Sequence, residues 1–329
     1  MITSIRDCIF QISSRKEFEE TALEVFHIQA ENNPVYRKFI INLGKKGNKI
    51  KSLTEIPFLP VEFFRNHKIV TGTSSAEAVF ESSRTTGLVS SRHYVTDLTV
   101  YQESFLKGFR FFHGDPADYF FGCFLPSYTE RGNSSLVYMA NGLIKASSDR
   151  QSGFYMNEIE KLITGLQRVK KEKRKGMLIG VSFALLDLAE KFSPDLSGIS
   201  VVETGGMKGR RKEITREELH SVLKNKLNLK SVQSEYGMTE LLSQAWSEED
   251  GIFYSPPWMK IIIRDPEDPL SVIEKSGTPG GINVIDLANF NSCSFIATGD
   301  LGKLHADGGF EVLGRFDNSD IRGCNLMFE

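Results

Sequence analysis

The sequence predicts an α/β fold in which mixed sheets are flanked by helices, with a β-rich part at the C-terminal end. Two observations support this prediction. Between residues 177 and 235, short apolar runs of strand length alternate with segments of helical periodicity, which is typical of a mainly parallel sheet covered by helices. From about Gly251 onward, proline and glycine multiply between short alternating segments, which is typical of antiparallel strands.

Helices are indicated where a capping signal precedes apolar residues at helical spacing. Ser14 and Glu17 have the spacing of a capping box, Asp97 is a candidate N-cap, and Thr215 begins a third helix. The expected buried faces are Phe18, Ala22, Val25 and Phe26; Leu98, Tyr101, Phe105, Phe109 and Phe112; and Leu219, Val222, Leu223 and Leu227.

Strands are indicated by short apolar or alternating runs bounded by turn residues. The expected strands are residues 78–80, 93–96, 119–125, 177–181, 200–203, 231–235, 260–263 and 309–313. Together these elements predict one domain with three parts. The parts are a helical segment (1–55), an α/β segment (56–250) and a β-rich segment (251–329).

Composition excludes several classes of protein. The 329 residues carry 40 Lys and Arg against 42 Asp and Glu, so charge gives no argument for binding nucleic acid or an anionic membrane. An apolar content of 40% with 25% charged residues excludes wholesale disorder. The four cysteines are widely spaced, which favours free thiols in the cytoplasm. The N-terminus does not resemble a signal peptide, and the longest apolar run, 177–189, is too short to span a membrane.

Other chemistries are disfavoured by their patterns. The six histidines show no spacing typical of metal ligands. Residues 180–184 resemble half of a nucleophile elbow but lack its final glycine, which argues against a serine hydrolase. Seven phenylalanines could line an acyl tunnel, although ordinary core packing is the expectation; they are Phe105, Phe109, Phe111, Phe112, Phe120, Phe121 and Phe124.

One polar segment carries groups suited to a polyphosphate. Residues 82–92 combine serine and threonine hydroxyls, a glycine and the guanidinium groups of Arg84 and Arg92 between two expected strands. Hydroxyls, loop amides and guanidinium groups are the donors that phosphates require. Read alone, the segment is better explained as a polar hairpin loop, because turns rich in serine and threonine are common.

Three further segments follow along the chain. Residues 234–240 come directly after an expected strand, where Glu240 is placed to hold Mg²⁺ and Tyr236 to stack on a base. The alternative is a simple turn hinged at Gly237. Residues 297–302 and 314–323 would each pass alone for a β-turn with a polar tip. The order of all four segments carries the argument.

That order resembles the adenylate-forming superfamily, which includes acyl-CoA synthetases, aryl-CoA ligases and firefly luciferase. The phosphate loop Ser-Ser-Gly-Thr-Thr-Gly is matched by residues 82–87 except at Arg84. The motif Tyr-Gly-x-Thr-Glu is matched by 236–240 and Thr-Gly-Asp by 298–300, while the hinge motif is matched loosely by 314–323. The resemblance implies the fold of the superfamily's N-terminal domain.

The chain more closely resembles the LuxE-like acyl-protein synthetases. The resemblance rests on residues 203–210, on residues 321–326 and on the short length. The chain stops just past the hinge motif, so the mobile C-terminal domain with its catalytic lysine is expected to be absent, as in LuxE-like proteins.

The resemblance implies roles for individual residues. On the phosphate side, Thr85 and Thr86 would hold the β- and γ-phosphates, Thr239 would contact the α-phosphate and Glu240 would hold Mg²⁺. Arg92 is an additional clamp on chemical grounds. The other members of the phosphate loop are Ser82, Ser83, Arg84 and Gly87.

On the nucleoside side, Tyr236 would stack on adenine, Asp300 would accept both ribose hydroxyls and Arg315 would support the ribose. The remaining nucleotide-binding positions are glycines, namely Gly205 and Gly206 in the adenine-side loop and Gly237 in the tyrosine motif.

The implied reaction joins a carboxylic acid, most simply a fatty acid, to ATP with Mg²⁺ and passes the acyl group to a thiol. In acyl-protein synthetases the thiol is a cysteine near the C-terminus, and Cys324 has that position. The final acceptor would be a reductase, CoA or a carrier protein, and a homo-oligomer is consistent with the resemblance.

Two alternatives to the acyl-protein synthetase function stay open. One alternative is a CoA ligase or an acyltransferase for polysaccharide precursors. Another is a non-catalytic protein that binds nucleotide or a partner.

Arg84 is the main departure from the pattern. If the glycine that it replaces has a positive φ, arginine there costs about 1–2 kcal/mol and could shift the loop. Alternatively, its guanidinium supplies charge that a lysine supplies elsewhere in the superfamily.

Overall fold

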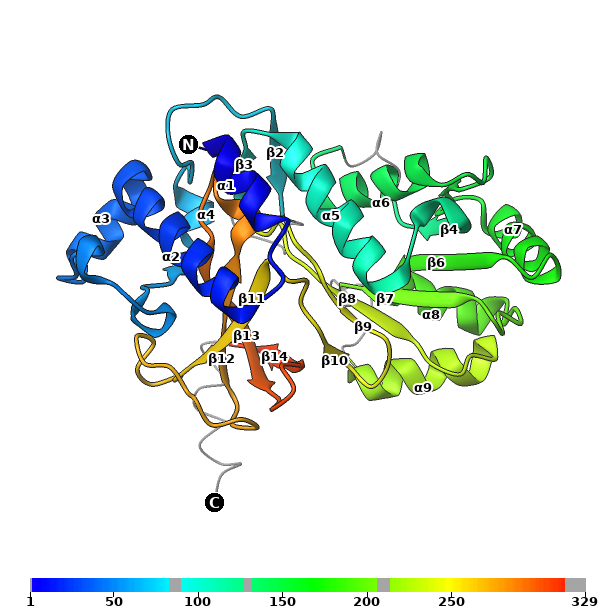
Figure 1. The fold of residues 1–329 in the computed structure, drawn as a ribbon. Helices are drawn as coiled ribbons and strands as arrows, with labels where there is room; N and C mark the ends of the chain where they lie inside the picture. Colours follow the sequence, from blue (N-terminus) through cyan, green and yellow to red (C-terminus); the bar gives the residue numbers. More distant parts are fainter. Residues whose placement is uncertain (1, 83–89, 127–131, 206–213, 317–329) are drawn as a thin grey trace, which may run out of the picture. The chain divides into compact units, whose positions relative to one another are not determined.

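The computed structural model describes residues 2–82, 90–126, 132–205 and 214–316 (Figure 1). The chain forms two compact units. Unit 1 comprises Met1–Glu77, His93–Asp97 and Tyr254–Glu329, and unit 2 comprises Ala78–Arg92 and Leu98–Phe253.

Unit 2 contains the predicted parallel sheet. Its strand order is β5-β4-β6-β7-β8-β9, and every neighbouring pair is parallel except β8 and β9. The strands are β4 (Tyr119–Phe124), β5 (Gly153–Phe154), β6 (Lys175–Val181), β7 (Ser200–Thr204), β8 (Gln233–Tyr236) and β9 (Ala245–Ser247). The strands expected at 119–125, 177–181, 200–203 and 231–235 are therefore confirmed within two residues at each end.

Helices pack against this sheet (Figure 1). They are α5 (Leu98–His113), α6 (Ser135–Ala146), α7 (Ile159–Lys171), α8 (Ser182–Lys191) and α9 (Arg216–Leu227). Alternation along β4 assigns its faces, because Phe120 contacts α7 at Gly165 whereas Phe121 lies 5.4 Å from the Phe109 ring of α5. The remaining short elements are β2 (Ala78–Glu81), β3 (Arg92–Val95), β10 (Ile252–Phe253) and the 3₁₀ helix η3 (Pro116–Asp118).

The aromatic cluster is mainly ordinary core. Five of the seven phenylalanines are buried, and they are Phe105, Phe109, Phe120, Phe121 and Phe124. Their rings pack edge to face with neighbours on helix and strand, as at Phe109 and Tyr119, whose centroids lie 5.4 Å apart. Phe111, in contrast, is 60% exposed, so it belongs to the surface.

A half-buried imidazole at the end of α5 predicts loss of stability in acid. The His113 ring lies 4.6 Å from Trp246, and burial lowers the pKa of His113 to about 4. The folded state therefore favours the neutral ring, and this contribution is present above the ordinary pKa of about 6.5 and is lost as the pH falls toward 4. We expect the free energy of unfolding to fall by up to about 3 kcal/mol across that range.

Urea denaturation of the wild type and of His113→Phe at several pH values between 7 and 4 measures this effect. The variant should show a shallower decrease, whereas the exposed control His67→Phe should follow the wild type. An unchanged pH dependence in His113→Phe would exclude the imidazole as its cause.

Unit 1 combines N-terminal helices with the β-rich tail. Its sheet has the order β14-β13-β12-β11 with antiparallel neighbours, and β1 pairs in parallel with the first half of β13. The strands are β1 (Leu59–Pro60), β11 (Met259–Arg264), β12 (Gly280–Asp286), β13 (Phe295–Leu304) and β14 (Phe310–Arg315). The helices are α1 (Ile2–Ile9), α2 (Arg15–Asn32), α3 (Pro34–Asn42), α4 (Phe63–Asn66), η1 (Gly47–Lys49), η2 (Leu53–Glu55) and η4 (Leu287–Asn289).

Buried polar contacts join α2 to the tail. The Gln29 amide donates to the carbonyls of Asn289 and Phe290 at 3.1 and 3.0 Å, and its oxygen accepts from the Ser294 amide at 3.0 Å. Beside them, the rings of Phe26 and Phe295 lie 5.8 Å apart. The N-terminal helices and the last third of the chain therefore share one core.

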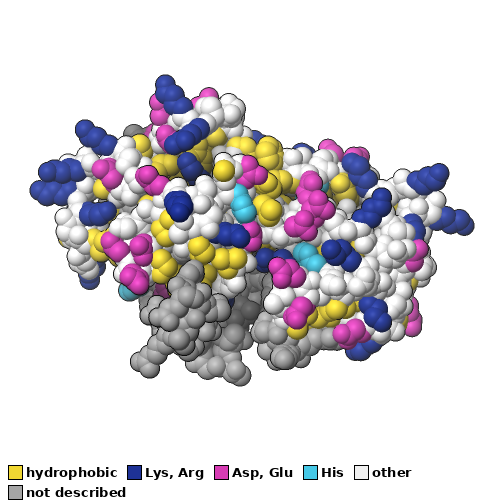
Figure 2. All heavy atoms as spheres, turned by 90° about the horizontal axis from the view of Figure 1, so that it is seen from below, with side chains coloured by type: hydrophobic (Ala, Val, Ile, Leu, Met, Phe, Trp, Pro, Cys, Tyr) yellow, Lys and Arg dark blue, Asp and Glu magenta, His cyan; other side chains and the backbone are white. Residues whose placement is uncertain are grey.

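The surface agrees with the balanced composition. Acidic and basic side chains are interspersed over the face drawn in Figure 2. None of the helices within the described ranges has the length and apolar character needed to cross a membrane. The apolar run at 177–189 divides at Ser182, where β6 ends and α8 begins.

Candidate nucleotide site

The carboxyl ends of the parallel strands in unit 2 hold several of the residues predicted from the motifs. The chain leaves β4 for β5 on one side and returns to β6 on the other, so the strand order reverses between β4 and β6. In open α/β sheets, ligands bind outside the carboxyl ends of the strands near such a reversal. Gly205 follows β7 at this edge, and residues 237–240 follow β8.

The tyrosine motif forms a compact turn at the end of β8. Tyr236 is only 8% exposed, and its ring lies 5.9 Å from that of Phe253 at 61°. The Leu241 amide donates to the Met238 carbonyl at 3.1 Å and closes the turn. Within that turn Glu240 is 5% exposed. The predicted aromatic and acidic residues are therefore the buried residues on either side of one turn.

Two glycines give the backbone at this edge its shape. Gly205 has a φ of +65°, which disfavours any other residue. A Cβ at Gly237 would collide with Glu235 Oε1, so the absence of a side chain leaves room for that carboxylate. Glu235 in turn accepts a hydrogen bond from the Thr204 hydroxyl at 2.5 Å, which joins the ends of β7 and β8.

A buried acidic network at the same edge was not predicted from the sequence. Glu203 Oε2 accepts from the Ser182 hydroxyl at 3.0 Å, and Ser182 also contacts the Gly205 carbonyl. Glu203 Oε1 lies 3.5 Å from Arg216 Nε and 3.8 Å from His220 Nε2. Burial alone would raise the pKa of the Glu203 carboxyl. The neighbouring His220 imidazole and the charge of Arg216 outweigh burial and hold that pKa below its ordinary value.

The same network explains the half-motif around Ser182. The serine begins α8 directly after β6, as in a nucleophile elbow, but its hydrogen-bond partners are a carboxylate and a carbonyl. The imidazole of His220 instead faces Glu203 and the hydroxyl of Ser234, 3.4 Å away. This arrangement differs from the serine–histidine pair of a hydrolase.

Neutralising the buried carboxylate should destabilise unit 2. Glu203→Gln removes the charge of a buried carboxylate that pairs with the half-buried Arg216, and is expected to lower the free energy of unfolding by about 2 kcal/mol. Glu217→Gln, at an exposed position on α9, is the matched control and should stay within about 0.5 kcal/mol. Denaturant titration measures both, and equal stability of the two variants would show that Glu203 has no net structural role.

In unit 1 the structure places Asp300 beside Arg315. The two residues are register partners on β13 and β14, with Arg315 Nε 3.5 Å from Asp300 Oδ1. Asp300 is 9% exposed, and its amide donates to the Thr298 hydroxyl at 3.1 Å. The Phe316 amide donates to the Gly299 carbonyl at 2.7 Å, which fixes the start of the hinge-like segment against the Thr-Gly-Asp segment. That segment lies within strand β13 and is not the β-turn that it resembled when read alone.

Several predicted positions lie outside the described residues. They are Ser83, Arg84, Thr85, Thr86, Gly87, Gly206 and Cys324. The base of the predicted phosphate loop is described, and there the Ser82 amide donates to the Ser91 carbonyl at 3.1 Å while the Ser91 amide donates to Ser82 Oγ at 2.9 Å. Arg92 follows as the exposed first residue of β3.

The described cysteines differ in accessibility. Cys123 and Cys293 are buried, and burial raises the pKa of each thiol to about 12. Thiols with such values carry almost no thiolate at neutral pH and are poor nucleophiles. Cys8 is exposed on α1.

Glu240 fits a magnesium ion that is bound together with a nucleotide. Mg²⁺ usually takes one or two carboxylates together with substrate phosphates and water. Within the described ranges, His, Cys, Asp and Glu side chains form no group of three or more that could hold a metal alone. As a single carboxylate, Glu240 has the chemistry to share an ion with phosphates.

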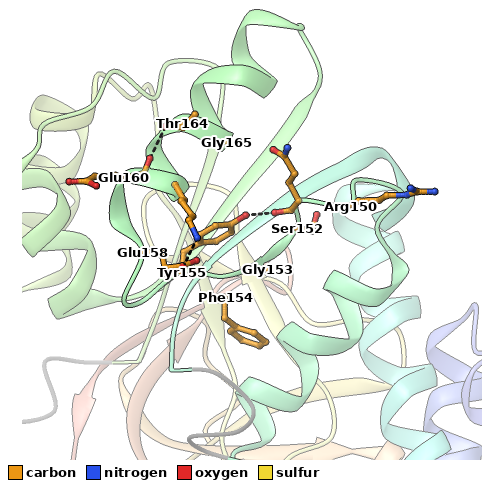
Figure 3. A pocket seen from close by; sticks show the side chains of 11 residues that line it. Arg150, Ser152, Gly153, Phe154, Tyr155, Glu158, Glu160, Thr164 and Gly165 are labelled. Carbon is orange, nitrogen blue, oxygen red and sulfur yellow. Dashed lines mark hydrogen bonds and ion pairs between the residues drawn. The ribbon is translucent and has the colours of Figure 1, made fainter.

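A separate pocket lies beside β5, the strand at one end of the sheet order (Figure 3). Its volume is about 580 Å³, and residues 150–155 of the β5 region and the first turns of α7 line it. Lys161 pairs with Glu158 at 2.7 Å, and the Thr164 hydroxyl donates to the Glu160 carbonyl at 2.8 Å. None of the residues predicted from the motifs lines this pocket.

Comparison with known proteins gives structural matches. No protein-family model and no curated protein matches the chain. A 2-hydroxyisobutyryl-CoA ligase in the post-adenylation state, in complex with R3-HIB-AMP, is 15% identical with a TM-score of 0.66, over 94% of this chain and 70% of that chain. ATP-bound MatB from Rhodopseudomonas palustris is 19% identical with a TM-score of 0.53, over 72% and 48% of the two chains.

A long-chain-fatty-acid-CoA ligase from Archaeoglobus fulgidus is also similar, with 16% identity, a TM-score of 0.51 and coverage of 76% of this chain and 53% of that chain. The chain thus spans about half the length of two of these three structures. The predicted fold class is confirmed: the chain has the α/β fold of the N-terminal domain of adenylate-forming enzymes.

Proposed function

We propose that the chain uses ATP to activate a carboxylic acid as an acyl-adenylate and then transfers the acyl group to a protein thiol, in the manner of an acyl-protein synthetase. One observation carries the proposal. Four motifs of adenylate-forming enzymes occur in order on the corresponding fold. Their described parts are a turn after β8 with Tyr236 and Glu240 buried on either side, and an Asp300–Arg315 pair on β13 and β14.

In the first half-reaction a carboxylate oxygen attacks the α-phosphorus of ATP. The bond between the α-phosphorus and the bridging oxygen breaks, and pyrophosphate leaves. Such chemistry depends mainly on positioning and on neutralising charge. Tyr236 and the glycines Gly205 and Gly206 would hold adenine, Asp300 would accept the ribose hydroxyls, and Thr239 would contact the α-phosphate.

The phosphate loop would hold the leaving group. Thr85 and Thr86 would donate to the β- and γ-phosphates, with Arg84 and Arg92 supplying positive charge. Bound Mg²⁺ would neutralise the phosphate charge, with Glu240 as its protein ligand.

In the second half-reaction a thiolate attacks the acyl carbonyl carbon. The carbon–oxygen bond to AMP breaks, AMP leaves, and the thiol proton passes to solvent. Cys324 is the proposed acceptor, from which a reductase would take the acyl group. The buried thiols Cys123 and Cys293 are chemically unsuited to this step.

Transfer to coenzyme A is the second candidate. It is favoured by the matched structures, two of which are described as CoA ligases. Competition between acceptors separates the two candidates. Acyl-CoA formed in preference to acyl-protein would support the ligase, whereas an acylated sugar would indicate an acyltransferase for polysaccharide precursors.

Acid-dependent exchange of pyrophosphate into ATP tests the proposal. The protein is assayed with Mg²⁺ and a panel of fatty and aryl acids, and intact mass is measured with and without coenzyme A. We expect exchange with one class of acid and a matching acyl adduct on the protein. Folded protein that supports no exchange with any acid would contradict the proposed activity and leave a non-catalytic binding role.

A further inference from the structure

Arg264 is a charged residue in an apolar setting. It ends β11 after three consecutive isoleucines and is only 9% exposed. Arginine is seldom buried unless its donors are satisfied. Its guanidinium donates to the Ile282 carbonyl at 2.7 Å, to Asn283 Oδ1 at 2.9 Å and to the Thr298 carbonyl at 2.6 Å. The side chain therefore connects β11, β12 and β13.

The neighbouring strands make room for this guanidinium. A Cβ at Gly281 would lie 2.5 Å from Arg264 Cζ, so only glycine leaves the space that the group fills. The register of β12 against β13 also shifts between Gly281 and Asn283. The ring of Phe316 closes one side, with Cζ 5.4 Å from its centroid. This close packing around the guanidinium indicates that the cation has a specific role.

Arg264 is connected to Asp300 through Thr298, which forms hydrogen bonds with both residues. Arg264 holds the Thr298 carbonyl, while the Thr298 hydroxyl donates to the Ile282 carbonyl at 2.9 Å and accepts from the Asp300 amide at 3.1 Å. The carbonyl and the hydroxyl of Thr298 are thereby both held in place. The backbone of the Thr-Gly-Asp segment of β13 is therefore held by the same interactions that hold Arg264.

We propose that Arg264 is a positioning residue that orients Asp300 toward the ribose hydroxyls and thereby makes the site selective for ribonucleotides over deoxyribonucleotides. This inference rests on the proposed function, because that function identifies the bound nucleotide as ATP. A site built to hydrogen-bond a hydroxyl rejects analogues that lack it, because its own polar groups are then left unpaired. Small displacements of such a group have large effects.

Nucleotide binding to the whole protein tests the inference independently of catalysis. Dissociation constants for ATP, 2′-deoxy-ATP and 3′-deoxy-ATP are measured by calorimetry for the wild type, Arg264→Met, Arg264→Lys and the exposed control Arg37→Met. We expect the wild type and the control to prefer ATP. Arg264→Met should reduce that preference by about tenfold while retaining affinity for the deoxy analogues. Arg264→Lys should be intermediate, because an ammonium cannot span the same acceptors.

The outcomes separate this inference from the proposed function. A selective wild type that supports no acid-dependent exchange would contradict the activity and leave the inference standing. Equal weakening of all three nucleotides in Arg264→Met, with the preference unchanged, would show a merely structural role and overturn the inference. A wild type that does not discriminate, or binds no nucleotide, would overturn it as well.

If Arg264→Met does not fold, a second variant tests the same inference. Asn283→Ala removes one guanidinium contact and should reduce the preference for ATP severalfold. An unchanged preference would again overturn the inference.

Discussion

Replacing Asp300 by asparagine should lower kcat/KM for ATP in acid-dependent pyrophosphate exchange by about a hundredfold. A carboxylate can accept from both ribose hydroxyls, whereas an amide offers one oxygen acceptor and no charge. Hydrogen bonds to charged groups contribute about 1.5–3 kcal/mol each, so losing one or both gives an effect of this order. The loss should appear mainly in KM, because the ribose is bound in the ground state as well as in the transition state.

The substitution should leave the fold intact. Arg315, the partner of Asp300 at 3.5 Å, has a side chain that is 69% exposed, and such pairs contribute little to stability. Asp307→Asn is the matched control on the nearby hairpin and should retain wild-type kinetics. If Asp300→Asn were as active as Asp307→Asn, Asp300 would not be the ribose ligand.

The Cys324→Ser variant should separate the two half-reactions completely. We expect the acyl adduct seen by intact mass to disappear, because a serine hydroxyl is a far weaker nucleophile than a thiolate. Acid-dependent exchange should stay within about twofold of the wild type, since acyl-adenylate formation does not use the thiol. A hydroxylamine trap of the acyl-adenylate would confirm that the first half-reaction still operates.

Cys8→Ser provides the control for thiol specificity. Cys8 is an exposed cysteine, so its loss should leave the adduct unchanged. An adduct that persists in Cys324→Ser but is lost in Cys8→Ser would place the acceptor on α1. An acyl group found only on added coenzyme A would favour the CoA ligase.

Local signals in the sequence predicted individual helices and strands in both units. Ser14 and Glu17 form the expected capping box, and Thr215 accepts from the Glu218 amide at 3.1 Å at the start of α9. The buried apolar faces of these helices follow from the same periodicity, although Val222 is only half-buried. Such features depend on residues a few positions apart, which is why pattern and propensity suffice to predict them.

Which segments of the chain come together to form unit 1 could not be predicted in this way. Residues 59 and 60 form a strand that pairs with residues 296 and 297, although turn residues and a short length hide it in the sequence. Gln29 likewise bonds to carbonyls of η4 and the residue after it, far along the chain. These associations depend on tertiary packing between distant segments, and no local pattern records them.

Within the candidate site, the motif residues could be predicted from the sequence, but the buried charged residues that pack around them could not. Tyr236, Glu240 and Asp300 belong to short contiguous motifs. Glu203 begins the segment 203–210 but was given no role there, and Arg264 belongs to no motif. Each is a charged residue at or near the end of an apolar strand. That mismatch is the one signal that could have marked them, because burying a charge requires partners that only the fold supplies.

The fate of labelled oxygen tests the central claim most directly. The protein is incubated with ATP, Mg²⁺ and an acid carrying ¹⁸O in its carboxylate, and the released AMP is analysed by mass spectrometry. If the carboxylate attacks the α-phosphorus and a thiol then attacks the carbonyl carbon, AMP must carry one labelled oxygen. Label found instead in inorganic phosphate, with ADP as an intermediate product, would contradict adenylation and require a different mechanism of activation.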